Sequence, residues 1–370
     1  MSELKVNSIK GVGASTAAIT VNNTDGTCTA NITNNLSNKN VIKNSAMQIA
    51  QRGTSFTSVT SSAYHLDRFY LYLQNTSAAF TATQSTDSPD GFANSYKLDV
   101  TTEDTSIASN EEIKLQYKLE GFDVQRFAKG TSAAKKFTLS FYVKTNKLGT
   151  YCVEFYDRDN GRDVSGSYTV SNTNWNRYTI DFPADTTGAF ENDNESSLEI
   201  TWWLVAGAAV QGGTLNTAWR SSADPSSATG QVNFTESDTN DWLITGVQLE
   251  ATDNGVATDF EHRSFGQELA LCQRYCVVDV AEKYWYNGHG GNVRDYSYYS
   301  FPTTMRAAPT ITFGTPITET LLNTSGGAGH QARKITASSW QYGPRASGTG
   351  NAYGEIPYTA DAEIIPDSTF

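Results

Sequence analysis

The chain has 370 residues, of which 12% are aromatic and 18% are charged, and its formal net charge is −12 at pH 7. This length suits two or three domains, and a composition rich in aromatic and poor in charged residues is typical of β-rich surface proteins rather than helical enzymes. Residues 53–262 carry 28 acidic against 14 basic side chains, which argues against a nucleic acid partner because phosphate binding depends on Lys and Arg.

The first 40 residues include eighteen Ser, Thr or Asn and few apolar side chains. A segment of this kind cannot bury a core alone, so it is either disordered or pairs with other chains. Residues 18–21 and 28–32 flank a turn-forming run at 22–26, which predicts a small hairpin. We therefore expect residues 1–40 to be an attachment segment, and its candidate contact residues are Leu4, Val6, Ile9, Ile19 and Val21.

A linker at 41–63 is expected to lead into a central domain at 64–262, where apolar and polar residues alternate. Alternation with period two indicates half-buried strands. Asn160-Gly161 is a strong hairpin signal, because both positions accept a positive φ. About nine or ten short strands separated by turns predict an antiparallel β-sandwich of jelly-roll type. The clearest strands are 66–73, 96–100, 113–119, 137–143, 151–156, 164–170, 177–182, 198–205 and 242–249.

One connecting helix is predicted within 263–278. Ser264 and Gln267 form a capping box, and an apolar stripe follows at helical spacing, made of Phe265, Leu269, Cys272 and Cys276. Apolar packing accounts for both cysteines, and a metal site that includes His262 is the alternative.

A smaller β-domain is expected at 279–370, with strands at 277–280, 310–313 and 332–336. Its aromatic residues are concentrated in Gly-rich surroundings, where they suit sugar stacking or contacts between subunits, while core packing is the alternative. In the central domain, the neighbours Trp202 and Trp203 must face opposite sides of their strand, so one is core and the other offers a possible stacking surface. The glycan-binding candidates are Trp285, Tyr286, His289, Tyr298, Trp340, Tyr342 and Trp203.

Two acidic segments, 157–163 and 185–195, are candidate structural calcium loops. The first lacks the glycine position and terminal bidentate Glu of an EF-hand, and acids that cluster in a loop are usually solvated. We therefore expect two solvated loops, no metal site and no cofactor, with a structural calcium as the weaker alternative.

No nucleophile elbow, phosphate-binding loop or metal-like spacing of histidines is present, so no enzyme is expected and no catalytic residue is proposed. Glycosidase chemistry needs only two carboxylates and stays open as an alternative. The four cysteines are too few and too widely spaced for a disulfide framework, so we expect reduced thiols. No leader peptide or membrane span is expected, and residues 202–210 form the longest strongly apolar run.

Six motifs together resemble tail fibre proteins of tailed bacteriophages, with the greatest likeness to fibres of phages that infect cyanobacteria and other marine bacteria. They occur in family order up to about residue 310, and they are 45–53 (SAMQIAQRG), 67–69 (DRF), 244–250 (ITGVQLE), 260–263 (FEHR), 268–275 (ELALCQRY) and 301–306 (FPTTMR).

The resemblance implies a homotrimeric virion protein, made in the host cytoplasm, that attaches to phage tail proteins through its N-terminus. It further implies a sandwich similar to a carbohydrate-binding module and distal parts that bind host surface polysaccharide or lipopolysaccharide, without catalytic residues or membrane insertion. The sequence therefore predicts a receptor-binding tail fibre with its tip at 279–370. A structural adaptor without receptor binding, or a polysaccharide depolymerase, are the alternatives.

Overall fold

The computed structural model describes residues 6–10, 12, 19–21, 24, 28–30, 38–222, 225–285, 296–320, 330–345 and 352–364. Near the N-terminus, three short strands form an antiparallel sheet, β1 (Ser8–Ile9), β2 (Ile19–Val21) and β3 (Cys28–Ala30). The pairing of β2 with β3 confirms the predicted hairpin. Val6 and Ile9 are exposed, whereas Ile19 and Val21 are half-buried, and Leu4 lies outside the described residues.

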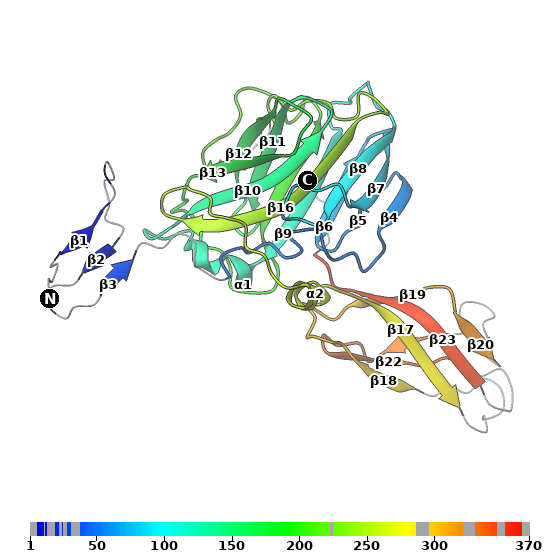
Figure 1. The fold of residues 1–370 in the computed structure, drawn as a ribbon. Helices are drawn as coiled ribbons and strands as arrows, with labels where there is room; N and C mark the ends of the chain where they lie inside the picture. The colour runs from blue at the N-terminus through cyan, green and yellow to red at the C-terminus, as the bar shows by residue number, and fades with distance from the viewer. Residues whose placement is uncertain are drawn as a thin grey trace.

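Residues 55–252 form an antiparallel sandwich of two sheets (Figure 1). This confirms the predicted fold class, and every strand pair in both sheets is antiparallel. The six-stranded sheet runs in the order β13 (Asn176–Phe182), β10 (Lys136–Thr145), β16 (Asp241–Thr252), β8 (Ser95–Thr102), β7 (Ala79–Ser85), β4 (Ser55–Val59). The seven-stranded sheet runs in the order β15 (Arg220–Ser221), β12 (Arg162–Val170), β11 (Gly149–Asp157), β14 (Ser196–Ala206), β9 (Glu112–Glu120), β6 (Phe69–Gln74), β5 (Ala63–Tyr64).

The core of the sandwich follows directly from period-two alternation. On β9, Ile113, Leu115, Tyr117 and Leu119 are fully buried and belong to the core between the sheets. Successive side chains of a strand point to opposite faces, so Glu112, Lys114 and Gln116 lie on the outer face. The same alternation on β11 and β14 gives the seven-stranded sheet one apolar face and one face of polar and aromatic side chains.

The Asn160-Gly161 turn joins β11 to β12 as predicted, and Gly161 adopts a φ of +59°. This left-handed conformation is one that glycine adopts without steric cost.

Residues 41–63 are packed against the sandwich, which corrects the expectation of a linker. Val41, Ile42 and Met47 are part of the main core cluster, and 55–59 forms β4 at the edge of the six-stranded sheet. Asn44 ties the segment together, because its side-chain amide donates to the carbonyl of Ile49 and its Oδ1 accepts from the amide of Ile49. The sequence of this segment does not alternate between apolar and polar residues, because its buried residues at 41–47 lie in turns and not in a long strand.

Three short helical elements accompany the sandwich. α1 (Gly121–Val124) and the 3₁₀ turn η1 (Gln125–Phe127) follow β9, and α2 (Phe265–Gln273) follows β16. The capping box of Ser264 and Gln267 is present as predicted. The predicted stripe is partly wrong, because Phe265 is exposed and Cys276 starts the next strand. Glu268 and Cys272 are the buried side chains of the helix.

The C-terminal part packs two small sheets against each other below α2 (Figure 1). Their shared core contains Val277, Trp340, Tyr342 and Tyr358. One sheet joins β17 (Cys276–Trp285), β23 (Ala352–Asp361), β19 (Thr310–Phe313) and β20 (Thr318–Thr320), and the other joins β18 (Ser297–Ser300), β22 (Ser339–Tyr342) and β21 (Ala332–Arg333). Within the described part of the chain, no helix combines the length and apolar character that crossing a bilayer requires.

Candidate functional site

A cleft of about 280 Å³ lies over the outer face of the seven-stranded sheet. Its volume is close to the lower end of the range for small-molecule sites, about 300 to 1,000 Å³. Strands β6, β9, β11 and β14 supply its base, each through alternate residues that face away from the core. The side chains that shape it are Tyr72, Gln74, Asn110, Glu112, Lys114, Gln116, Glu154, Tyr156, Arg158, Glu199, Thr201, Trp203, Ala209, Val210, Ser222 and Ser227.

Trp203 forms the floor of the cleft. Its indole Nε1 donates a hydrogen bond of 3.2 Å to Oε2 of Glu154, and the Lys114 ammonium lies 4.1 Å from the ring centroid. The same ammonium lies 5.2 Å from the Tyr72 ring and 2.6 Å from Oε2 of Glu112. Trp203 is only 1% exposed, which corrects the expectation of an open stacking surface at this residue.

Glu199 is held by an array of donors on neighbouring strands. Its carboxylate accepts from Nη1 of Arg158 at 3.2 Å and from the side-chain amide of Gln116, and Nζ of Lys118 lies 3.0 Å away. Burial alone would raise the pKa of Glu199, but Lys118 and Arg158 outweigh it and lower that pKa below its ordinary value. Glu199 is therefore a fixed anion whose lone pairs are already engaged.

Glu154 has the opposite character. Burial raises its pKa to about 7, against the stabilising charge of Lys114. The register of β11 with β14 brings the two carboxyl groups into the same cleft. Glu154 is paired with Thr201, and Tyr156, two residues after Glu154 on the same face of β11, is paired with Glu199. At neutral pH Glu199 is therefore a permanent carboxylate, whereas Glu154 is partly protonated and able to donate.

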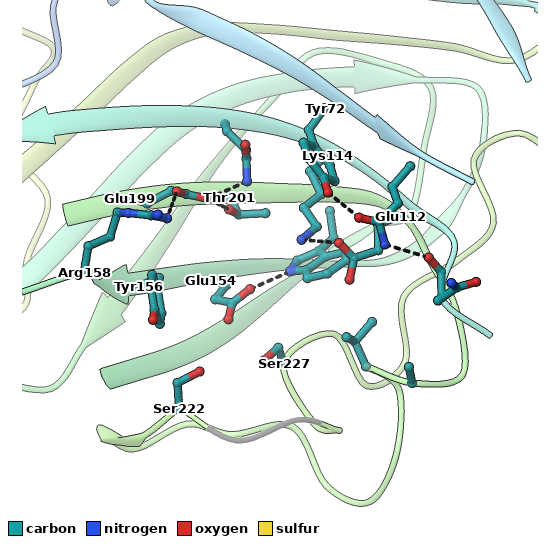
Figure 2. A pocket seen from close by; sticks show the side chains of 16 residues that line it. Tyr72, Glu112, Lys114, Glu154, Tyr156, Arg158, Glu199, Thr201, Ser222 and Ser227 are labelled. Carbon is teal, nitrogen blue, oxygen red and sulfur yellow. Dashed lines mark hydrogen bonds and ion pairs between the residues drawn. The ribbon is translucent and has the colours of Figure 1, made fainter. Parts of the chain in front are cut away.

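Two tyrosines stand at the rim, Tyr72 on β6 and Tyr156 on β11, and both are half-buried. The Arg158 guanidinium lies 5.7 Å from the Tyr156 ring centroid. Burial raises the pKa of both tyrosines, so their hydroxyls remain neutral donors. Ser222 and Ser227 also line the cleft, and Figure 2 shows them below Tyr156 and Glu154.

The aromatic candidates of the C-terminal domain are placed differently from the sequence-based expectation. Trp340 and Tyr342 are fully buried in the core of that domain, which corrects their assignment as surface residues. Tyr298 is 72% exposed on β18. The backbone of Trp285 ends β17, but its side chain, together with Tyr286 and His289, lies outside the described residues.

Sequence reasoning missed most of the cleft, although a signal was present. Three outward-facing sets occur on the strands, namely 112, 114 and 116, then 154, 156 and 158, then 199, 201 and 203. Each set mixes charged with aromatic or amide side chains. Only the antiparallel pairing of β9, β14 and β11 brings the three sets together.

The acidic loops are solvated only in part: Glu191 and Glu195 are exposed, but three aspartates are buried, which corrects the expectation for these three. Asp157 and Asp163 are fully buried, Asp185 is 4% exposed, and each pairs with a cation. Within the described ranges, no cluster of three or more His, Cys, Asp or Glu could hold a metal ion. The alternative site at Cys272 and Cys276 is made of two buried thiols whose pKa values burial raises well above the ordinary value. His262 instead packs against Phe92 and Phe260.

No protein-family model matches this sequence, and no curated protein matches it. Among solved structures, the enzymatically active domain of tailspike protein 4 of bacteriophage CBA120 is 14% identical with a TM-score of 0.29, over 53% of this chain and 21% of that chain.

Two further solved structures are similar over most of their own length. The C-terminal family 22 carbohydrate-binding module of Clostridium thermocellum Xyn10B is 10% identical, with a TM-score of 0.30 over 60% of this chain and 99% of that one. A putative sugar-binding protein from Bacteroides thetaiotaomicron is 12% identical, with a TM-score of 0.30 over 58% and 100%. The chain thus spans about a fifth of the tailspike structure and nearly all of both sugar-binding ones, and likenesses of this size assign no activity to it.

Proposed function

We propose that the chain is a non-enzymatic, glycan-binding subunit of a phage tail fibre, and that the cleft on the seven-stranded sheet binds the glycan. The observation that carries the proposal is the combination, in one cleft, of two rim tyrosines with fixed donors and acceptors. Sugar rings offer apolar faces that pack on aromatic rings, and hydroxyls that both donate and accept. Lys114 and Arg158 supply donors, and Glu154 supplies a donor or an acceptor, depending on pH.

Charge favours an uncharged glycan over a strongly anionic one. The lysine and arginine of the cleft each lie beside a carboxylate, Lys114 beside Glu112 and Arg158 beside Glu199. An anionic sugar would compete with these internal pairs and would also meet Glu154. Neutral hydroxyls can join the existing hydrogen bonds without breaking them.

Binding is favoured over hydrolysis by the state of Glu199. Glycosidases use one carboxyl group as an acid and a second, free carboxylate as a base or nucleophile. Glu154 could serve as the acid, but the carboxylate of Glu199 is already held by Lys118, Arg158 and Gln116. These contacts lower its basicity and occupy the oxygen atoms that would activate water.

The experiment is calorimetric titration of the purified chain with neutral and uronic-acid-containing oligosaccharides. Tyr72→Ala and Tyr156→Ala are each expected to weaken binding by about tenfold, as the loss of one aromatic contact predicts. Tyr298→Ala in the C-terminal domain serves as the matched control and should bind as the unmodified chain does. Loss of binding in the control variant alone would instead move the glycan site to the C-terminal domain.

The same proposal has three further parts, which rest on the sequence resemblance. They are attachment to the tail through residues 1–40, assembly as a homotrimer and a location in the virion. Three weak sites per fibre would give strong adsorption through avidity. Mass measurement in solution tests the trimer. Incubation with host polysaccharide tests the absence of hydrolysis, since released oligosaccharides would show a depolymerase. If deletion of residues 279–370 abolishes adsorption while cleft binding persists, the C-terminal domain also contacts the host.

A further inference from the structure

The Lys129 ammonium lies in a cage of oxygen atoms on the inner side of the sandwich. Its Nζ is 2.5 Å from Oδ2 of Asp157 and 3.0 Å from Oδ2 of Asp185. It also donates to the carbonyl oxygens of Thr187 and Gly188, each at 2.8 Å. The side chains of Lys129 and Asp157 are 0% exposed and that of Asp185 is 5% exposed, so this cation has exchanged water for four protein oxygens.

The cage brings together three separate parts of the chain. Asp157 ends β11, Asp185 begins the loop after β13, and Lys129 lies in the connection between η1 and β10. The remaining oxygens of the two carboxylates are also engaged. Oδ1 of Asp157 accepts from the backbone amide and side chain of Asn160, and Asp185 accepts from Arg162. Both carboxylates of the cage are therefore also held by partners other than Lys129.

Two carboxylates and two backbone carbonyls converge on one point in this cage. These are the ligand types that calcium prefers. Calcium-to-oxygen distances are about 2.3 to 2.6 Å, so the oxygens would need to contract by only a few tenths of an ångström from their present positions around the nitrogen. Calcium takes about 6 to 8 oxygens, and waters could supply the rest in the volume left by the lysine stem. Two aromatic rings also lie near the ammonium, since the ring centroids of Trp219 and Phe190 are 5.2 and 5.4 Å from Nζ.

We propose that this cage is a calcium-type cation site which Lys129 fills with its own ammonium group, so that the fold closes these loops without a metal. A tethered cation is always present at full occupancy, whereas a metal ion must be bound from solution. The same cage should accept Ca²⁺ once the ammonium is removed. The inference does not depend on glycan binding, since the cage lies on the opposite face of the sheet from the cleft.

Thermal unfolding of the full chain in calcium chloride and in a chelator tests the proposal. The unmodified protein should unfold at the same temperature in both. Lys129→Ala should unfold at a lower temperature than the unmodified protein in chelator and should recover stability with Ca²⁺ more than with Mg²⁺, which tolerates the irregular geometry of such a cage less well. Calorimetry with calcium chloride alone should show one site in the variant and none in the unmodified chain.

Two further variants keep the result unambiguous. Lys144→Ala removes a lysine that pairs with Asp87 at the surface and should create no response to calcium. Lys129→Ala combined with Asp157→Asn should lose the response because a ligand is gone. If Lys129→Ala does not fold during expression, refolding from denaturant in calcium but not in chelator supports the proposal. Failure in both, a folded variant without calcium binding, or an unmodified protein that chelator destabilises would overturn it.

Discussion

The Arg68 guanidinium and the Glu363 carboxylate form an ion pair between the sandwich and the end of the C-terminal domain, and their side chains are 1% and 0% exposed. The Arg68 guanidinium also lies 3.4 Å from the ring centroid of Tyr275, which precedes β17. The backbone amide of Arg68 donates to Glu363 at 3.1 Å. The two halves of the chain are therefore joined by a dry, charged contact instead of an exposed hinge.

Removal of either partner at this contact should be costly. Arg68→Met leaves the carboxylate of Glu363 buried, with Arg52 as a weaker neighbour at 3.6 Å, and a loss of about 3 to 5 kcal/mol in unfolding free energy is expected. Urea unfolding followed by tryptophan fluorescence measures the change. Asp87→Asn at the exposed pair with Lys144 is the control, with an expected loss below about 1 kcal/mol. Equal losses in both variants would contradict the importance of the buried pair.

Glu154 should make stability depend on pH. Its pKa is raised from 4.5 in the unfolded chain to about 7 in the folded protein, so between these pH values the folded state holds a proton that the unfolded state has released. Its contribution is therefore fully present below about pH 4.5 and is lost as the pH rises through about 7. Glu154→Gln, measured by urea unfolding from about pH 5 to about pH 8, should show a flatter fall in stability with rising pH.

Glu112→Gln is the matched control for that measurement, because it removes a carboxylate from the same cleft. It should leave the slope between about pH 5 and about pH 8 unchanged. A slope that persists in Glu154→Gln would show that another group takes up the proton.

Gly246 should not tolerate a side chain. It adopts a φ of +61° beside an irregularity in the pairing of β10 with β16, and a Cβ there would lie 2.7 Å from Phe92 and 2.8 Å from Tyr142. Gly246→Ala is expected to lose roughly 1 to 3 kcal/mol from backbone strain alone, and more from the clash. Gly213 adopts a φ of +69°, and a Cβ added there would have no atom within 4 Å. Gly213→Ala therefore measures the backbone strain without a clash. Thermal unfolding of the two variants should therefore give the lower midpoint for Gly246→Ala.

The sandwich could be predicted because its strands alternate strictly. Ile113, Leu115, Tyr117 and Leu119 specify an inward face without any knowledge of their partners. The Asn160-Gly161 turn and the Ser264 cap were equally local signals, and the structure confirms both. Each of these features depends on residues that are close in sequence, which is the range over which patterns can be read.

The cleft and the cation cage depend on contacts between distant residues. Glu154 and Glu199 are 45 positions apart and meet only through the register of β11 and β14. The acidic segments at 157–163 and 185–195 looked solvated because no local pattern showed that Lys129 would lie between them. The prediction of surface positions for Trp340 and Tyr342 was wrong for the same reason, because composition does not show which face of a short strand is buried.

The chain enters the sandwich beside the point where it leaves. Lys39 donates to the carbonyl oxygen of Asp259 at 2.6 Å, Arg263 donates to that of Ile42 at 2.8 Å, and Lys43 donates to the Tyr275 hydroxyl at 2.7 Å. Tension applied between the N-terminal segment and the C-terminal domain would therefore pass through this short bridge of polar contacts. None of the residues that line the cleft takes part in these contacts, so such tension would load the bridge before it loads the cleft.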